Sequence, residues 1–535
     1  MKLLLICIII SLSILFSNGQ DQSLNLVPYP QSVTNYWTTV SIQPSGFSIQ
    51  SNSASLTLAV AIKRYSALMF PFGEGNGTSG STTLQITVSS SNEDLFLGVD
   101  ESYQLSTSSS SSFSIQSNTI YGAMRGLETF KQLMVYDLSN NEYFLSQCSI
   151  SDYPRFPWRG FMIDTARHYY PVDAILHMID SLGYNKFNVL HWHIVDAVAW
   201  PVVSSTYPQL TDAAYAPSAV YSHSEIQQVV AYAKTYGIRV VPEFDIPGHA
   251  ASWGVGYPDV VATCPAYAGN VNNIPLDISN PATYTFIENL FTEIVPLFPD
   301  QYFHTGGDEV VLQCWSDDPA IQSWMTKNGY NTVTAEQYFE SQLDTILQKL
   351  NRTKLIWNDP IDNGCDIIKS AIVQVWNSDT DSQTILDDGY KILVSFDWYL
   401  DKQDPTGDIH YEWQDTWQDF YNADPYNNIS SHTQNILGGE ATMWSEQVSH
   451  VNWDVRVWPR TIGIGERLWS DQSINSVDDA LPRIELYSCD LSRRGIASGP
   501  LTPGDYCPLP TDLAYTLKPV MHIDSKTLLE IYNSF

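Results

Sequence analysis

The stretch that decides the fold spans residues 187–244. It reads FNVLHWHIV at residues 187–195, SHSEIQQVVAYAKTYG at residues 222–237 and IRVVPEF at residues 238–244. The outer segments are short apolar runs typical of buried strands, and the middle one has the apolar spacing of an amphipathic helix. Ser222 stands three residues before Glu225, which predicts a capping box, and Gly237 predicts the helix end. Strand, helix and strand in this order indicate a βα repeat.

The same alternation extends along most of the chain. An amphipathic helix is also predicted for VDAILHMIDSLGYN (172–185), ending near Gly183. Eight apolar segments predict strands, and they are GFMID (160–164), FNVLHWHIV, IRVVPEF, YFHTG (302–306), KLIWN (354–358), IVQVW (372–376), KILVSF (391–396) and ILGGEATMW (436–444). Eight strands with intervening helices favour an α/β fold of the (β/α)8 TIM barrel type over an open doubly wound sheet.

The chain before the barrel has a different texture. Residues 20–155 are rich in Ser and Thr, with the strand-like TTLQITVSS (82–90), a low-complexity STSSSSSFSIQ (106–116) that predicts an exposed turn, and the helical TIYGAMRGLETFKQLM (119–134). We therefore predict a small α+β domain without a catalytic cluster. The apolar start MKLLLICIIISLSILFSNG predicts a cleaved signal peptide. The expected organisation is signal peptide 1–19, α+β domain 20–155, and barrel with a C-terminal extension 156–535.

Further features fit an exported protein. Asn76, Asn351 and Asn428 begin triplets that match the acceptor for N-glycosylation. Cys7 is lost with the signal peptide, and the sequence does not choose among pairings of the six cysteines that remain, Cys148, Cys264, Cys314, Cys365, Cys489 and Cys507. Their spacing does not match a metal site.

The chain of 535 residues is strongly acidic, with a formal net charge of -32 at pH 7 and a sequence pI near 4.4. Such a charge argues against nucleic acid or an anionic membrane as partner, because both would be repelled. Two interpretations remain open: the charge serves solubility, or the protein works in an acidic compartment where carboxylates are partly protonated.

Polar and aromatic residues follow every predicted strand, at the end where barrel enzymes build their sites. They are Arg167, His168, His193, Asp196, the run Glu243 to His249, Asp308, Glu309, Trp357, Asp359, Trp376, Trp398, Tyr399, Asp401, Trp444 and Glu446. Acids and tryptophans without a phosphate-binding glycine loop or a Ser/Cys nucleophile motif indicate a sugar ligand, because tryptophan rings cover the apolar faces of a pyranose and carboxylates bind its hydroxyls.

The segment Gly306-Gly307-Asp308-Glu309 is the strongest catalytic candidate. Neighbouring strand residues point to opposite faces, so both carboxylates reach one site only if the strand has ended and the glycines turn the chain. We expect the charge of Asp308, together with burial, to raise the pKa of Glu309. The alternative is a solvated pair at a helix start. Adjacent carboxylates suit substrate-assisted hydrolysis of an N-acetylhexosaminide, in which the acetamido oxygen attacks the anomeric carbon.

Six motifs in register carry a resemblance to a known family. HTGGDEV (304–310), IDTARHYYPV (163–172), HWHIVD (191–196), PEFDIPGHAASW (242–253), WYLD (398–401) and GGEATMWSE (438–446) closely resemble the β-N-acetylhexosaminidases of glycoside hydrolase family 20, particularly the eukaryotic lysosomal type. The resemblance implies Glu309 as general acid/base, Asp308 as the residue that orients the acetamido group, Tyr399 as donor to its oxygen, and His249 as partner of the acid. It further implies that the sugar is held by Arg167, Asp196, Glu446, Trp357, Trp376 and Trp444.

The resemblance also implies two disulfides, Cys264 with Cys314 and Cys489 with Cys507, and leaves Cys148 and Cys365 undecided. It suggests a homodimer. We expect no cofactor and a place in the secretory pathway, with the lysosome as the predicted location; the sequence does not decide between retention there and secretion. Two departures from the family pattern stand out. The chain after Asp196 reads Ala-Val-Ala-Trp-Pro instead of continuing with the usual Ser-Phe-Pro, and Asp401 is followed by Lys402. An acid at the position of Asp401 goes with neutral substrates in relatives, so we expect weak activity on sulfated sugars.

Two rival functions remain. A metal-dependent hydrolase could use the histidines of HWH with His249 and Asp308 as ligands, and activity retained in a chelator would exclude it. Against it, a buried histidine pair in a barrel is as often a hydrogen-bonded core element. A sugar-binding protein without activity would bind chitobiose and not hydrolyse it. Our prediction is a glycosidase without a metal, acting on terminal N-acetylglucosamine and N-acetylgalactosamine.

Overall fold

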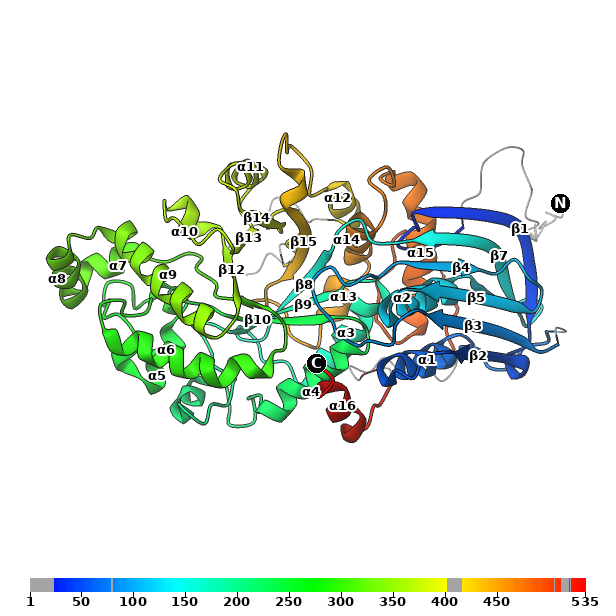
Figure 1. Cartoon of the computed structure of the whole chain (residues 1–535), viewed down its shortest axis with the longest axis horizontal. Helices are drawn as coiled ribbons and strands as arrows, with labels where there is room; N and C mark the ends of the chain where they lie inside the picture. The colour runs from blue at the N-terminus through cyan, green and yellow to red at the C-terminus, as the bar shows by residue number, and fades with distance from the viewer. Residues whose placement is uncertain (1–23, 78–79, 402–415, 505, 511–518, 520) are drawn as a thin grey trace, which may run out of the picture.

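The computed structural model describes residues 24–77, 80–401, 416–504, 506–510, 519 and 521–535. They form a closed barrel and a seven-stranded sheet, placed side by side along the long axis of the molecule (Figure 1). The predicted signal peptide and Lys402 lie outside the described residues. Within the described ranges, every helix is too short or too polar to cross a membrane.

The barrel consists of eight parallel strands in sequential order, with β15 closing onto β8. Their bounds are β8 Trp158–Asp164, β9 Val189–Val195, β10 Arg239–Phe244, β11 Tyr302–His304, β12 Thr353–Trp357, β13 Ile372–Val375, β14 Lys391–Val394 and β15 Ile436–Met443. Each of the eight predicted segments overlaps one of these strands, which confirms the barrel. Every residue of β8 and β9 is buried, because core side chains fill the inside and helices cover the outside.

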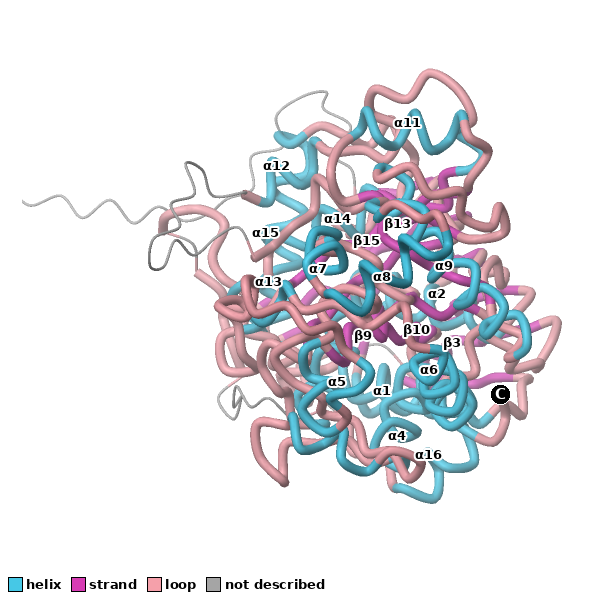
Figure 2. Tube along the Cα trace, turned by 90° about the vertical axis from the view of Figure 1, so that its left-hand side faces the viewer, coloured by secondary structure: helices cyan, strands magenta, loops and turns pink. Residues whose placement is uncertain are grey.

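Helices surround the strands, as the view along the long axis shows (Figure 2). Those between strands are α3 Val172–Tyr184, α4 His223–Lys234, α5 Ala251–Gly256, α6 Pro281–Ile294, α7 Leu312–Asp317, α8 Pro319–Asn328, α9 Thr332–Lys349, α10 Asp359–Asp362, α11 Asp379–Asp387 and α12 Trp417–Asn422. Those after the last strand are α13 Trp453–Val457, α14 Arg460–Trp469, α15 Val477–Arg493 and α16 Ser525–Tyr532. The predicted capping box of Ser222 and Glu225 is present at the start of α4.

The second sheet precedes the barrel and has the strand order β1-β7-β4-β5-β3-β2, with β6 paired to β7. The strands are β1 Ser32–Ile42, β2 Phe47–Ser51, β3 Thr82–Val88, β4 Tyr103–Ser106, β5 Ser112–Ser117, β6 Met134–Asp137 and β7 Glu142–Asp152, and the helices are α1 Leu56–Leu68 and α2 Ile120–Gln132. The serine-rich run forms the turn between β4 and β5, as predicted. Parallel and antiparallel pairs both occur, so the α+β character is confirmed, whereas the domain boundaries stay predictions.

Helix α2 lies between this sheet and the barrel, and its residues 120–131 are all buried. Its Arg125 donates hydrogen bonds to the main-chain oxygens of Tyr236 and Phe187 on the barrel side. Three buried ion pairs cross the same boundary, Glu101 with Arg159, Asp152 with Lys186 and Glu128 with Arg494. Since buried charges are stable only when paired, these contacts fix the sheet on the barrel.

Cystine bridges join Cys264 to Cys314 and Cys489 to Cys507, the pairings that the resemblance implies. Cys148 and Cys365 are free and buried in separate hydrophobic clusters, so the structure does not pair them. The three predicted glycosylation sites are all at exposed asparagines. Exposure is necessary for modification but does not demonstrate it, and glycosylation stays a prediction.

Candidate active site

The glycine pair turns the chain directly after a barrel strand. Strand β11 ends at His304, and Gly306 and Gly307 have φ angles of 66° and 96°, in the left-handed region that glycine adopts at little cost. A Cβ atom at Gly306 would lie 1.7 Å from Oδ1 of Asp245, so no other residue fits there. The strand has therefore ended before the two acids, as the sequence predicted.

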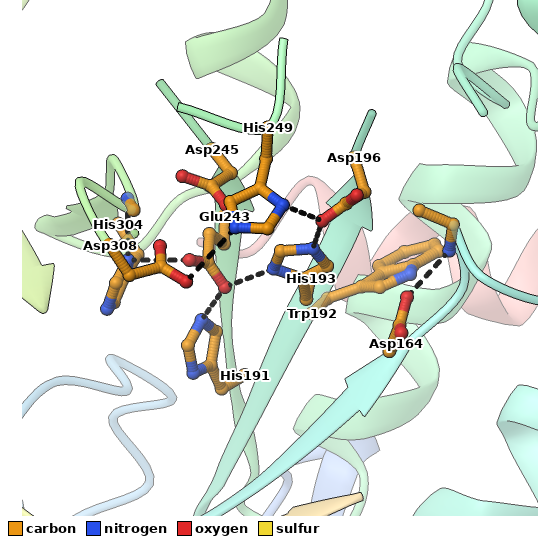
Figure 3. Close-up of polar contacts among 12 residues, drawn as sticks. Asp164, His191, Trp192, His193, Asp196, Glu243, Asp245, His249, His304 and Asp308 are labelled. Carbon is orange, nitrogen blue, oxygen red and sulfur yellow. Dashed lines mark hydrogen bonds and ion pairs between the residues drawn. The ribbon is translucent and has the colours of Figure 1, made fainter. Parts of the chain in front are cut away.

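Asp308 and Glu309 both approach the imidazole of His249. Its Nε2 lies 3.7 Å from Oδ2 of Asp308 and 3.5 Å from Oε2 of Glu309 (Figure 3 shows His249 and Asp308). Asp308 is buried, whereas the side chain of Glu309 is 60% exposed. Among the residues that the structure describes, none donates a hydrogen bond to Oδ1 of Asp308. Asp308 thus has a buried oxygen that can accept a hydrogen bond from a ligand, and Glu309 has a carboxyl that faces solvent.

The pKa of Glu309 is shifted in the direction opposite to our expectation. The approach of the His249 imidazole to 3.5 Å lowers the pKa of Glu309, and the partial exposure of Glu309 limits the opposing effect of burial. Burial raises the pKa of Asp308 to about 7, with the charges of Asp359 and Glu243 adding to it. The prediction that Glu309 has the raised pKa was wrong for the free site, because the turn buries Asp308 and exposes Glu309.

A second charged group lies beside the pair. Arg167 Nη2 lies 2.9 Å from Asp196 Oδ2, and its Nε lies 4.0 Å from Glu446 Oε1. Asp196 is also 3.5 Å from Nδ1 of His249, on the side of the ring away from Glu309. Burial opposes the charge of Asp196, but Arg167 and His249 together lower its pKa far below the ordinary value. The predicted sugar-binding residues Arg167, Asp196 and Glu446 are therefore brought together.

The loop after Asp196, where the chain departs from the family pattern, is held by its own backbone. The N–H of Asp196 donates to the oxygen of Ala199 at 3.2 Å, and the side chain of Val198 is 39% exposed. An aliphatic surface thus stands where relatives continue with Ser-Phe-Pro.

Aromatic rings lie around the charged groups. The ring of Trp444 is 6.1 Å from that of Trp357, and the ring of Trp376 is 6.2 Å from that of Tyr399. Burial raises the pKa of Tyr399 well above its ordinary value, and the nearby charge of Asp401 adds to it, so Tyr399 keeps its proton as a donor. Trp357 is 1% exposed and Tyr399 is 7% exposed, while Trp376 and Trp444 are partly exposed.

A buried carboxylate below the acids, Glu243, was noted at its strand end in the sequence but was not assigned a role there. Glu243 contacts His193 Nδ1 at 2.6 Å, His191 Nε2 at 3.0 Å and His304 Nδ1 at 3.2 Å (Figure 3). It also accepts a hydrogen bond from Trp357 Nε1 at 2.8 Å. Burial opposes its charge, but the three histidines lower the pKa of Glu243 well below the ordinary value. Glu243 therefore connects four consecutive barrel strands and supports Trp357 from below.

The same contacts bear on the rival metal site. Among the residues that the structure describes, three groups have side chains close enough to share a metal ion, and they are His191 with Glu243 and His304, His193 with Glu243 and Asp245, and Asp196 with Asp245 and His249. In each group, histidine nitrogens already lie within ion-pair distance of carboxylates. This arrangement supports the interpretation of the two HWH histidines as hydrogen-bonded core residues.

Two further acids were not assigned a role. Asp164 ends β8 and lies 3.3 Å from Nη1 of Arg167, and Asp359 begins α10 directly after β12. Both stand at the carboxyl end of a predicted strand, and this position was the available signal. Their contacts could not be predicted, because they involve residues from other strands or depend on the turn that follows.

Comparison with known proteins identifies the family. The model of glycosyl hydrolase family 20, catalytic domain, matches residues 156–472, and a model described as beta-acetyl hexosaminidase like matches residues 26–133. The chain is 61% identical to Beta-hexosaminidase subunit A1 of Dictyostelium discoideum over 515 residues, covering 96% of each chain. It is 37% identical to Beta-hexosaminidase subunit beta of Rattus norvegicus, covering 90% of this chain and 92% of the relative.

A solved structure agrees. The chitobiase of Flavobacterium johnsoniae superposes with a TM-score of 0.78 at 32% identity, covering 90% of this chain and 74% of that one. The catalytic model covers more than half of the chain and contains the barrel and all the acids of the candidate active site. The chain therefore belongs to glycosyl hydrolase family 20, as a glycosidase of the eukaryotic β-hexosaminidase type.

Proposed function

We propose that this protein removes terminal non-reducing N-acetylglucosamine and N-acetylgalactosamine from glycoconjugates by a retaining, substrate-assisted mechanism. The observation that carries the proposal is the convergence of Asp308 and Glu309 on His249. Two carboxylates adjacent in the chain and directed at one imidazole are poorly placed to attack a sugar from opposite sides, so the acetamido oxygen of the substrate serves as the nucleophile.

The first step breaks the glycosidic bond. Glu309 gives its proton to the glycosidic oxygen while the acetamido oxygen attacks the anomeric carbon and forms a cyclic oxazolinium ion. Asp308 accepts a hydrogen bond from the acetamido N–H at its open Oδ1 and stabilises the positive charge, and Tyr399 donates to the acetamido oxygen. Water then attacks the same carbon and loses a proton to Glu309, which restores the acetamido group with retention of configuration.

The pKa values of the pair suggest how the proton reaches Glu309. In the free site the raised pKa places a proton on Asp308, not on Glu309. Substrate brings an N–H donor to Asp308, which favours its carboxylate, and covers Glu309, which favours its acid form. Nε2 of His249 lies within 3.7 Å of both carboxyls and offers a path for the transfer. Asp196, on the other ring nitrogen, stabilises the imidazolium.

The remaining charged and aromatic groups bind the sugar. Arg167, Asp196 and Glu446 hold ring hydroxyls, where bidentate contacts give orientation. Trp357, Trp376 and Trp444 surround the acetamido group and the apolar face of the ring. The acidic chain and the lowered pKa of Glu309 suit a compartment of low pH. We place the protein in the lysosome, with a secreted share, and propose a homodimer.

The acetamido group of the substrate tests this mechanism directly. Hydrolysis of 4-nitrophenyl N-acetyl-β-glucosaminide should exceed that of the matching glucoside by at least about 100-fold in kcat/KM, because the glucoside lacks the internal nucleophile. Both substrates should be compared from about pH 3 to pH 8, with the faster reaction best at acidic pH because Glu309 must start protonated. Equal turnover of the glucoside would mean that the protein supplies the nucleophile and would overturn the proposal.

Substrate charge is a second test, centred on Asp401. Its charge lies close enough to Tyr399 to affect the pKa of the phenol, so it stands beside the proposed sugar site. Asp401→Asn should raise kcat/KM on 4-nitrophenyl N-acetyl-β-glucosaminide 6-sulfate about five-fold or more, as expected from removing about 1 kcal/mol of repulsion. The neutral substrate is the internal control and should change by less than about two-fold. Equal changes on both substrates would contradict a role in charge selection.

A further inference from the structure

One carboxylate that has no role in the family resemblance joins two parts of the site. Asp359 is the first residue of α10, and its side chain receives two hydrogen bonds. The backbone N–H of Glu309 donates to Oδ1 at 3.1 Å, and the indole N–H of Trp376 donates to Oδ2 at 2.6 Å. The two oxygens of Asp359 thus connect the end of β11 with the end of β13.

The bond to Glu309 restrains an unfavourable backbone conformation. Glu309 has a φ angle of 49°, in the left-handed region that is unfavourable for a residue with a side chain. Gly306 and Gly307 lie shortly before Glu309. Because the backbone angles of glycine change easily, these two residues do little to hold the turn in place. The hydrogen bond to Asp359 opposes relaxation of this turn, and the direction of the Glu309 carboxyl depends on it.

The bond to Trp376 restrains the aromatic side of the site. The backbone N–H of Trp376 donates to Oδ1 of Asn358 at 3.0 Å, so the residue is held from β12 at two points. Its ring is 6.2 Å from that of Tyr399. A shift of Asp359 would therefore move the ring and the general acid together.

We propose that Asp359 is a positioning residue that fixes the backbone of Glu309 relative to Trp376, and so sets the direction of the general acid. It acts through these two residues and needs no contact with the substrate. The inference rests on the proposed function, in which Glu309 protonates the leaving group.

The test uses leaving groups that differ in their need for a proton. Asp359→Asn keeps the size of the side chain but leaves only one acceptor oxygen, so one of the two N–H donors meets an NH2 group. Because misplacement by about 1 Å can cost about 100-fold, kcat on chitobiose, which has a poor leaving group, should fall about 30-fold. On a 2,4-dinitrophenyl N-acetylglucosaminide, whose leaving group departs without protonation, kcat should fall less than about three-fold.

Two variants separate this role from general damage to the helix. Asp362→Asn is the matched control, since Asp362 ends α10 and its carboxylate accepts a hydrogen bond from Asn358 at 2.5 Å instead of contacting Glu309 or Trp376. It should leave the ratio of the two rates unchanged. Trp376→Phe removes the indole N–H and reduces the aromatic surface, so it should weaken substrate binding, through KM, with little dependence on the leaving group.

A drop of equal size on both substrates in Asp359→Asn would overturn the inference, as would no drop on either. Should Asp359→Asn fail to fold, Asp359→Glu carries the same test, because it keeps both acceptor oxygens but displaces them. Failure of the proposed function is distinguishable, since wild-type protein would then hydrolyse the plain glucoside as fast as the acetamido substrate, whatever Asp359 does.

Discussion

Glu309→Gln is expected to lower kcat on chitobiose by about 10³-fold or more, because a carboxamide can neither protonate the leaving oxygen nor accept a proton from water. KM should change little, since the side chain is directed at solvent in the free site and serves the transition state more than the ground state. Initial rates of wild type and variant at the acidic optimum, with melting temperature as a check on folding, measure the effect.

A small anion makes the experiment on Glu309 more specific. With a 2,4-dinitrophenyl substrate the first step needs no acid, so Glu309→Gln should still form the oxazolinium ion. Its hydrolysis should be slow, because the variant has no carboxylate to activate the attacking water. Azide needs no deprotonation and should restore turnover, giving the β-glycosyl azide. Glu288→Gln, on helix α6 in an ion pair with Lys349, is the control and should behave as wild type. More than about 10% residual kcat on chitobiose would assign the acid elsewhere.

Asp308→Asn is expected to lower kcat about 100-fold to 1,000-fold while making the free protein more stable at neutral pH. The loss arises because the amide cannot offset the positive charge on the acetamido nitrogen in the transition state. In the variant, either the oxygen or the nitrogen of the amide takes the place of the Oδ1 that would accept the acetamido N–H. The acetamido group is therefore also oriented less well for its attack. Kinetics on the acetamido substrate measure this part.

The gain in stability follows from the raised pKa of Asp308. The unfolded carboxyl loses its proton near pH 4, whereas the folded one keeps it up to about pH 7. Between these values the folded state binds more protons, so the stability of wild type falls as pH rises through this window. With one pKa unit worth about 1.4 kcal/mol, ionising Asp308 costs on the order of 2–4 kcal/mol.

Asparagine removes the cost of ionising Asp308, so the variant should melt above wild type at about pH 8 and should lose this advantage toward about pH 4. Thermal unfolding at the two pH values measures it. A gap between variant and wild type that does not change with pH would mean that Asp308 ionises normally. A variant that is more stable but less active would show that the Asp308 carboxyl, needed for activity, lowers the stability of the folded protein.

The barrel could be predicted because its signals are local. Each barrel strand is a short run of three to eight residues, and the helix of residues 223–234 carries its own capping box. The gathering of acids at the strand ends followed from the fold, since parallel strands place their carboxyl ends at one edge of a barrel. The turn could be predicted from Gly306 and Gly307, because other residues do not adopt such backbone angles easily.

The electrostatics of the site could not be predicted. Which of two adjacent acids is buried depends on the φ angle of Glu309 and on the ring of His249, sixty residues earlier in the chain. The role of Glu243 depends on Trp357, 114 residues away, and on histidines from two other strands. Such contacts depend on the register of the closed barrel, which apolar spacing does not determine.

The boundary between sheet and barrel has a consequence for how the protein can evolve. Arg159, Lys186 and Arg494 belong to the barrel side, and each has its carboxylate partner on the sheet side, in contacts closed to water. Exchange of the sheet for an unrelated module would leave Arg159 and Lys186 without a carboxylate partner and Arg494 with Asp490 alone, at several kcal/mol for each unpaired cation. Recombination between relatives is therefore constrained to transfer both parts as one block, although the sheet contributes no residue to the site.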